Sequence, residues 1–163
     1  MNHKHNAITI RRAEAPDTPA VIEILERTRF FRPGEIIIAR DLLDAALNDG
    51  PQGEFQSFVA VEDGNVAGWI CFGPTPCTLG TFDIYWVAVD PPAQRRGLGK
   101  AMTDYVTNII KRLNGRMIAV DTSGTDRYTP TRRFYEKLGF TQAATIREFY
   151  APGDDKVIYI KRV

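Results

Sequence analysis

The residues from Gln94 to Lys100 are the part of the chain whose types and spacing point most directly to chemistry. They combine two glycines with three cations: Gln94, Arg95, Arg96, Gly97, Leu98, Gly99 and Lys100. The first backbone N–H groups of a helix have no partner within the helix, and the helix dipole adds partial positive charge there. Glycine lets such a backbone approach a ligand closely. At the start of a helix, this segment predicts a binding site for a diphosphate.

Two better-known phosphate motifs do not match this segment. A dinucleotide fingerprint needs glycine or alanine three residues after Gly99, where the chain has Met102. A P-loop needs Ser or Thr after its Gly-Lys pair, where Ala101 follows Lys100. The alternative that stays open is that Gly97 and Gly99 only ease a turn, with the neighbouring cations solvated.

The elements on either side must position this segment. The apolar run Ile84–Val89 predicts a buried central strand over 81–89, which Asp90-Pro91-Pro92 ends because proline cannot donate to a strand ladder. From Leu98 to Leu113 the apolar residues recur in steps of three and one, which predicts a helix that Asn114-Gly115 ends.

The rest of the chain divides into short strands and helices. Strands are expected at 8–11, 55–62, 66–73, 117–120, from 140 onward and at 156–163. A first helix is expected after an N-cap at Asp17 or Thr18, with Pro19 near its first position, and a second one near Pro33-Gly34-Glu35. A short third helix is expected with Thr129 as its N-cap. The order β-α-α-β-β-β-α-β-α-β-β indicates one α/β domain over residues 1–163, with residues 1–6 as a flexible tail.

Charge and composition exclude several classes of function. The 21 basic and 20 acidic residues nearly cancel, so neither a nucleic acid nor a membrane is an expected partner. No apolar run resembles a signal peptide or approaches the ~20 residues of a membrane span, so we expect a cytoplasmic protein.

His3 and His5 are the chain's two histidines, so we expect no metal and no Ser-His or Cys-His nucleophile. Cys71 lies in an apolar run and Cys77 in a loop, and no disulfide between them is expected.

Three motifs, in order, resemble those of the GNAT N-acetyltransferases. Gln94–Gly99 matches that family's pyrophosphate motif, Gln/Arg-x-x-Gly-x-Gly/Ala, at every specified position. Trp86–Pro91 is similar to the end of its central strand, and Phe134–Phe140 to its later short helix. The resemblance implies the single-domain GNAT fold, with a mixed, mostly antiparallel sheet flanked by helices. It also implies an N-acetyltransferase that uses acetyl-CoA as co-substrate.

The resemblance assigns roles to particular residues. The backbone of Val87, Ala88 and Val89 would pair with the pantetheine arm, and a backbone N–H of Ala88 or Val89 would stabilise the thioester oxygen. Tyr135 would protonate the departing thiolate, as a neutral phenol can at physiological pH. The alternative for Tyr135 is a helix residue that only packs beside Phe134. The remaining cofactor-binding residues implied are Gln94, Arg95, Arg96, Gly97, Leu98, Gly99, Lys100 and Phe134.

The general base is a separate question. Asp83 lies early in the central strand, where some family members have a catalytic glutamate, and an apolar strand would raise the pKa of its carboxyl group. It could instead lie at the solvent end of the strand or pair with an arginine. Asp121 and Ser123 are alternatives, and many family members need no side-chain base. An acetyl-enzyme on Cys71 is not expected, because no neighbouring residue would activate the thiol.

The acceptor is expected to be a primary amine of a small molecule, such as an amino acid derivative, accepting the acetyl group by direct transfer. In the family the first two helices and the last hairpin shape the acceptor pocket, which here means 29–33 and 147–150. An acyl-CoA-binding sensor without turnover and an acetyltransferase of protein N-termini or lysines are the alternatives. The resemblance leaves a homodimer open.

Overall fold

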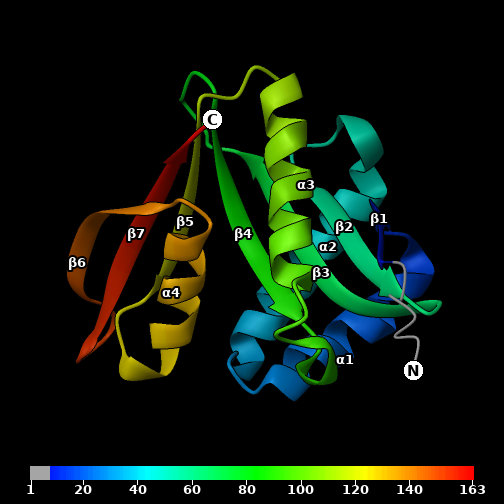
Figure 1. The fold of residues 1–163 in the computed structure, drawn as a ribbon, viewed down its shortest axis with the longest axis horizontal. Coiled ribbons are helices and arrows are strands. Elements are labelled where there is room, and N and C mark those ends of the chain that lie inside the picture. The colour runs from blue at the N-terminus through cyan, green and yellow to red at the C-terminus, as the bar shows by residue number, and fades with distance from the viewer. Residues whose placement is uncertain (1–7) are drawn as a thin grey trace, which may run out of the picture. The chain divides into compact units, whose positions relative to one another are not determined.

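The strands and helices follow the predicted order along the chain (Figure 1). The structure is a computed structural model that describes residues 8–163, so the expected tail of residues 1–6 lies outside the described residues. The strands are β1 Ile8–Arg12, β2 Gln56–Glu62, β3 Asn65–Pro74, β4 Thr81–Val89, β5 Met117–Ser123, β6 Thr141–Ala151 and β7 Asp154–Arg162. The α-helices are α1 Thr18–Thr28, α2 Pro33–Asp49, α3 Leu98–Arg112 and α4 Thr129–Lys137.

The strands form a sheet in the order β1-β2-β3-β4-β5-β7-β6. The β4–β5 pair is parallel, whereas β1–β2, β2–β3, β5–β7 and β6–β7 are antiparallel. The prediction of an α/β fold with a mixed, mostly antiparallel sheet and flanking helices is therefore confirmed. By its internal contacts the chain divides into two compact units, and both β4 and α3 contribute residues to each.

The first unit comprises residues up to Gly73 together with Trp86–Asn108. The β2–β3 hairpin turns at Asp63 and Gly64, which have φ of 51° and 80°, as a tight hairpin turn requires. The Trp69 side chain is fully buried, and its indole N–H donates to Ser57 Oγ at 2.6 Å. In Figure 1, α3 passes in front of β3 and α2 lies behind it. The predicted apolar stripe of α3 is confirmed from Leu98 to Ile110, but Leu113 lies beyond the end of the helix and is exposed.

The second unit comprises Pro74–Tyr85 and Ile109–Val163. Its core lies where α4 packs on β7, and the buried Tyr159 hydroxyl donates to Glu136 Oε1 at 3.0 Å. The prediction of Thr129 as N-cap is wrong, because the cap is Tyr128 and Thr129 is already helical. A 3-10 turn at Asp126–Tyr128 leads directly into α4, and Thr129 Oγ1 accepts a hydrogen bond from Arg132. Strand β6 is exposed at every position from Thr141 to Tyr150.

Candidate active site

The end of β4 is held against β3 in the first unit. The Asp90 N–H donates to Ala67 O at 2.9 Å, and the Ala88 oxygen would lie 3.1 Å from a Cβ added at Gly68 of β3. Since the N–H and C=O of one strand residue point the same way and alternate along the strand, the backbone of Ala88 faces β3. The backbone of Val87 and Val89 then faces the opposite edge. Of the three, Val87 and Val89 have the orientation that binding an extended ligand requires.

Strands β4 and β5 pair only over the first three residues of each. Their register runs from Thr81 opposite Met117 to Asp83 opposite Ala119 and ends there. Strand β4 nevertheless continues to Val89 and β5 to Ser123. Within the second unit, Ile84 and Tyr85 of β4 are therefore not paired with β5.

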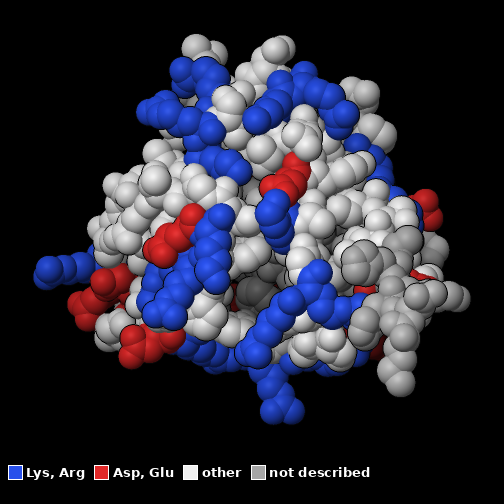
Figure 2. Space-filling model, in the orientation of Figure 1, with Lys and Arg blue, Asp and Glu red and all other residues white. Residues whose placement is uncertain are grey.

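The turn after β4 is tied to the strand by Gln94, whose side-chain amide donates to Val89 O at 3.1 Å. This contact gives Gln94 a role in shaping the turn. Two of the three cations are also paired, Arg96 with Glu62 of β2 and Lys100 with Asp104 one turn along α3. Figure 2 shows Lys and Arg side chains around the N-terminal end of α3, where Arg95, Arg96 and Lys100 are all exposed.

The backbone from Arg95 to Lys100 is arranged for an anion. Arg95 and Gly97 have φ of 62° and 89°, whereas Arg96 between them does not have positive φ. Such alternation turns successive N–H groups toward one point and forms an anion-binding concavity. Within the described part of the chain, none of the six amides from Arg95 to Lys100 donates a hydrogen bond. The first helical bond runs from Ala101 N to Gly97 O, at 2.9 Å.

The space beside this turn is open. A Cβ added at Gly97 would meet no atom within 4 Å, so the residue is glycine because of its backbone conformation and not because of crowding. Six unpaired amides, a helix N-terminus and three cations together suit the doubly charged diphosphate of a nucleotide-like ligand. The residues present therefore fit the pyrophosphate of coenzyme A.

The predicted base, Asp83, lies in the second unit and is half-buried. Thr75 Oγ1 donates to its Oδ2 at 2.7 Å. The pKa of Asp83 is raised, chiefly by desolvation, and the nearby charge of Asp121 adds to the effect, while the Thr75 hydrogen bond and Lys156 oppose it. The expected rise in pKa is confirmed in direction, although the pairing with Thr75 was not predicted.

The alternative bases both have close partners. Asp121 Oδ2 lies 2.5 Å from Lys156 Nζ, which also lies 4.8 Å from the ring centre of Phe149. Ser123 Oγ donates to Asp154 Oδ1 at 2.6 Å. Asp121 is thus neutralised by an ion pair with Lys156, whereas Asp83 has, among the described residues, only the Thr75 hydroxyl as a direct partner.

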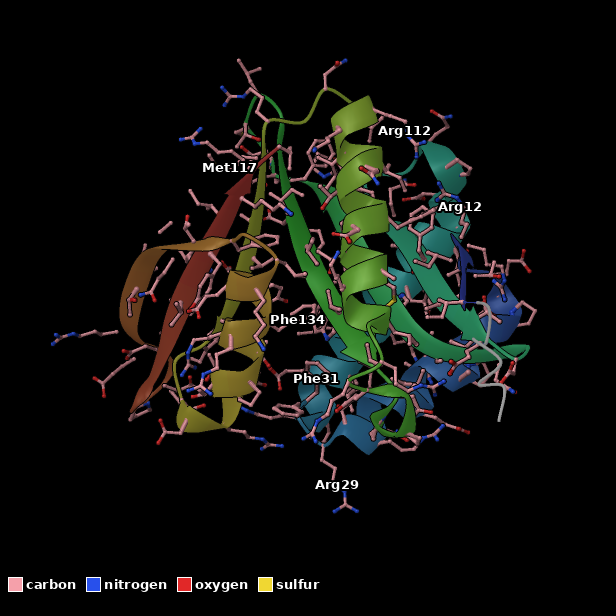
Figure 3. The ribbon with its side chains drawn as sticks, viewed as in Figure 1. Arg12, Arg29, Phe31, Arg112, Met117 and Phe134 are labelled. Carbon is pink, nitrogen blue, oxygen red and sulfur yellow. The ribbon has the colours of Figure 1, made fainter. Side chains whose placement is uncertain are left out.

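Tyr135 is buried on α4, with a side chain that is 7% exposed. Its ring lies 5.3 Å from Phe134, 5.5 Å from Phe140 and 6.2 Å from Tyr159, measured between ring centres. Burial raises the pKa of its phenol, so the group is protonated throughout the neutral range. Figure 3 shows the half-buried Phe134 on the same helix.

The two cysteines differ in environment and neither forms a disulfide. Cys71 is fully buried, and burial raises the pKa of its thiol to about 12. The thiolate that an acetyl-enzyme would need is therefore disfavoured. Cys77 is exposed and has φ of 60°.

The connection between α1 and α2 lies beside the end of β4 in the first unit. Arg27 Nη1 is 3.3 Å from Asp90 Oδ2, and the rings of Phe31 and Trp86 are 6.2 Å apart. Figure 3 shows Phe31 at this connection, with the Arg29 side chain directed away from the ribbon. A groove of about 370 Å³ runs along the two helices, lined by Ile22, Glu26, Pro33, Ile36, Ile37 and Arg40.

Sequence reasoning missed three residues of this arrangement. Thr75 and Lys156 reach Asp83 and Asp121 across the sheet, and Arg27 reaches Asp90 from a helix. No short-range pattern joins such partners; the only available signal was the polar Thr75 between two prolines.

Over residues 8–163, no group of side chains is placed to hold a metal ion, and no helix is both long and apolar enough to cross a membrane.

Comparison with known proteins gives consistent matches. The model of the acetyltransferase (GNAT) family matches residues 19–140. The ribosomal protein bS18-alanine N-acetyltransferase of Escherichia coli K12 is 28% identical over 90% of this chain and 89% of its own length. A solved GNAT-family protein from Desulfovibrio desulfuricans is 41% identical, with a TM-score of 0.91 over 96% of this chain and 99% of the other. The PaiA N-acetyltransferase of Thermoplasma acidophilum, solved with coenzyme A, has a TM-score of 0.77 at 16% identity, over 96% and 99% of the two chains.

Proposed function

Because the chain belongs to the GNAT acetyltransferase family and is an N-acetyltransferase, we propose that it transfers the acetyl group of acetyl-CoA to a primary amine. The observation that carries the choice of donor is the row of six unpaired amides from Arg95 to Lys100. These amides lie in a turn in which Arg95 and Gly97 have positive φ, and the turn leads into α3. This arrangement would hold the pyrophosphate, and Val87 and Val89 would pair with the pantetheine arm.

Acetyl-CoA, when bound, supplies an acetyl group activated as a thioester. Asp83 removes a proton from the acceptor ammonium, leaving a neutral amine with a lone pair on nitrogen. The N–H of Val89 would stabilise the negative charge on the thioester oxygen, because Ala88 is turned to β3. Tyr135 would give its phenolic proton to the departing sulfur, and Phe134 would flank the cofactor. The family resemblance supports these roles.

We further propose a small-molecule acceptor, bound beside the α1–α2 connection and working in the cytoplasm. The groove between α1 and α2 is lined by four apolar residues together with one acidic and one basic residue, Glu26 and Arg40. That combination suits a compact molecule with both an amine and a carboxylate. The connection itself is anchored to the end of β4 through Arg27 and Phe31.

A protein N-terminus is the second candidate acceptor. It is favoured by the 28% identity, over nine-tenths of the chain, to an enzyme that acetylates the alanine of a ribosomal protein. The two candidate acceptors can be distinguished by measuring thiol release from acetyl-CoA. The assay uses a set of amino acid derivatives and a set of short peptides with free N-termini. Turnover of peptides alone would contradict the small-molecule proposal. Tight cofactor binding without turnover of any amine would favour a sensor.

The donor assignment can be tested by substitution in the turn. Gly97→Glu should weaken acetyl-CoA binding, measured by calorimetry, by on the order of a hundredfold, because a carboxylate then faces the diphosphate. Gly64→Glu is the matched control: Gly64 is exposed, has φ of 80°, and an added Cβ there also meets nothing within 4 Å. If both variants bind as the wild type does, the pyrophosphate site lies elsewhere.

A further inference from the structure

The two oxygens of Asp83 have different environments. Oδ2 accepts the hydrogen bond from Thr75 Oγ1 at 2.7 Å, whereas Oδ1 accepts none from the described part of the chain. We propose that Thr75 is a positioning residue for the acetyl transfer: its hydroxyl fixes Oδ2, so that Oδ1 is left to take the proton from the acceptor ammonium. This inference rests on the proposed role of Asp83 as base.

The loop that carries Thr75 is built to hold the hydroxyl in place. The Thr75 N–H donates to Thr81 O at 2.9 Å, and the Thr78 hydroxyl donates to Thr75 O at 2.8 Å. Gly80, with φ of 81°, accepts at its carbonyl from the Arg116 N–H at 2.7 Å. A Cβ added at Gly80 would lie 3.2 Å from Asn114 O, so the loop is packed against the chain ahead of β5. The position of Thr75 is therefore determined by backbone contacts independent of Asp83.

The charged groups near Asp83 come from two further strands. Asp83 lies opposite Ala119 in the β4–β5 register, and Ser123 lies opposite Lys156 in the β5–β7 register. Residues 119, 121 and 123 point to one face because strand side chains alternate, so Asp83, Asp121 and Lys156 share that face. Lys156 is paired with Asp121 at 2.5 Å, which offsets the repulsion between the two carboxylates. Thr75 is then the group that contacts Asp83 directly.

The chemical consequence concerns geometry as well as charge. A carboxylate turns about its last side-chain torsion with broad preferences, so an unheld Asp83 would present either oxygen in several directions. With Oδ2 held, one N–H bond of the ammonium breaks, an O–H bond forms at Oδ1, and the electron pair stays on nitrogen. The hydrogen bond to Oδ2 also stabilises the charged form, so removing it should raise the pKa of Asp83.

The first test needs no acceptor. Carboxyl ¹³C NMR, with Asp83→Asn to assign the signal, follows the titration of Asp83 in the wild type, Thr75→Val and Thr75→Ser. Thr75→Val should titrate at higher pH, and Thr75→Ser, which keeps the hydroxyl, as the wild type does. Asp121→Asn should move the titration down, because it removes a like charge. An unchanged titration in Thr75→Val, or the same shift in Thr75→Ser, would overturn the proposal.

The second test measures transfer to whichever amine proves to be an acceptor. Thr75→Val should lower kcat by about tenfold, as expected for losing a hydrogen bond to a charged group, and move the acidic limb of kcat/KM to higher pH. KM for acetyl-CoA should not change, and Thr75→Ser should restore the rate. If Asp83→Asn is inactive while Thr75→Val equals the wild type, Asp83 stands as base and the role of Thr75 is wrong. If Asp83→Asn keeps full activity, Asp83 is not the base and the proposed role of Thr75 is also wrong.

Discussion

At the scale of single residues, burial sets the chemistry that Tyr135 can perform. Its phenol is enclosed by three aromatic rings, and the pKa is raised because the phenolate would be poorly solvated. A raised pKa makes the phenol a weaker acid but keeps its proton in place through the neutral range. Burial raises the pKa of a thiol in the same way, so a desolvated thiolate can still take that proton.

Tyr135→Phe tests this role while keeping the ring. The variant should lose kcat by on the order of a hundredfold, since the general acid is removed. Its KM for acetyl-CoA and its free energy of unfolding should change little, because the ring contacts remain. Steady-state kinetics and urea unfolding measure the two quantities. A kcat equal to that of the wild type would leave Tyr135 as a packing residue.

Much of the site's framework was predictable at this scale, and its fine geometry was not. Gly97 and its neighbours were identified because glycines and cations at a helix start have a direct physical meaning. The φ of Arg95 was not predictable, because arginine rarely adopts a left-handed backbone and nothing in its neighbours requires it. The hydrogen bond from Thr75 to Asp83 was also missed, because it depends on how a loop of mixed sequence closes.

At the scale of elements, the close approach of β3 and β4 sets the path of the chain into the turn. Gly68 lies where β3 faces Ala88, and a Cβ there would be 2.8 Å from Met102 Cε and 3.1 Å from Ala88 O. The methionine end can move, but the carbonyl belongs to the strand that leads into the Gln94–Lys100 turn. A larger residue at 68 would therefore displace β4 or α3.

Gly68→Ala should destabilise the fold by about 1–2 kcal/mol, as overpacking usually does. Gly34→Ala serves as its counterpart, because the added methyl meets nothing and alanine favours the helix. Urea unfolding of both variants provides the comparison. Equal stability of Gly68→Ala and the wild type would show that the two strands have room to separate.

Element boundaries were predicted well where periodicity and chain breakers agreed. The predicted apolar stripe begins at Leu98, which is the first residue of α3. The predicted stop at Asp90-Pro91-Pro92 comes directly after Val89, the last residue of β4. The start of α4 was off by one residue, because a 3-10 turn replaced the side-chain cap at Thr129. The early end of the β4–β5 pairing at Asp83 was not predicted, since strand pairing depends on residues far apart in sequence.

At the scale of the whole molecule, one buried carboxylate links folding to pH. Asp17 accepts two hydrogen bonds from Arg11 of β1, at 2.7 and 2.8 Å, and one from the Glu14 N–H at 2.8 Å. The pKa of Asp17 is lowered below its ordinary value of 3.8, first by the Arg11 hydrogen bonds. A carboxylate with a lowered folded pKa contributes stability above its unfolded pKa and loses it as the pH falls through the folded pKa.

Asp17→Asn should therefore lower the free energy of unfolding at pH 7 by about 1.5–3 kcal/mol, the range for hydrogen bonds to charged groups. The difference from the wild type should persist down to about pH 5 and shrink below about pH 4, the unfolded pKa of aspartate. Urea unfolding from pH 7 to pH 3 measures it, with Asp44→Asn on the exposed face of α2 as control. A difference that does not depend on pH would mean that packing, and not charge, accounts for the loss.

The contrast between the chain's two cysteines affects how its turnover is measured. Cys71 is buried and stays protonated, whereas Cys77 is exposed, so a thiol-reactive dye will modify on the order of one site per chain. A colorimetric assay of released coenzyme will begin with that background, and Cys77→Ser removes it. The same accessibility offers a fluorophore attachment point two residues from Thr75, where acceptor-induced changes in the loop would be visible without any engineered residue.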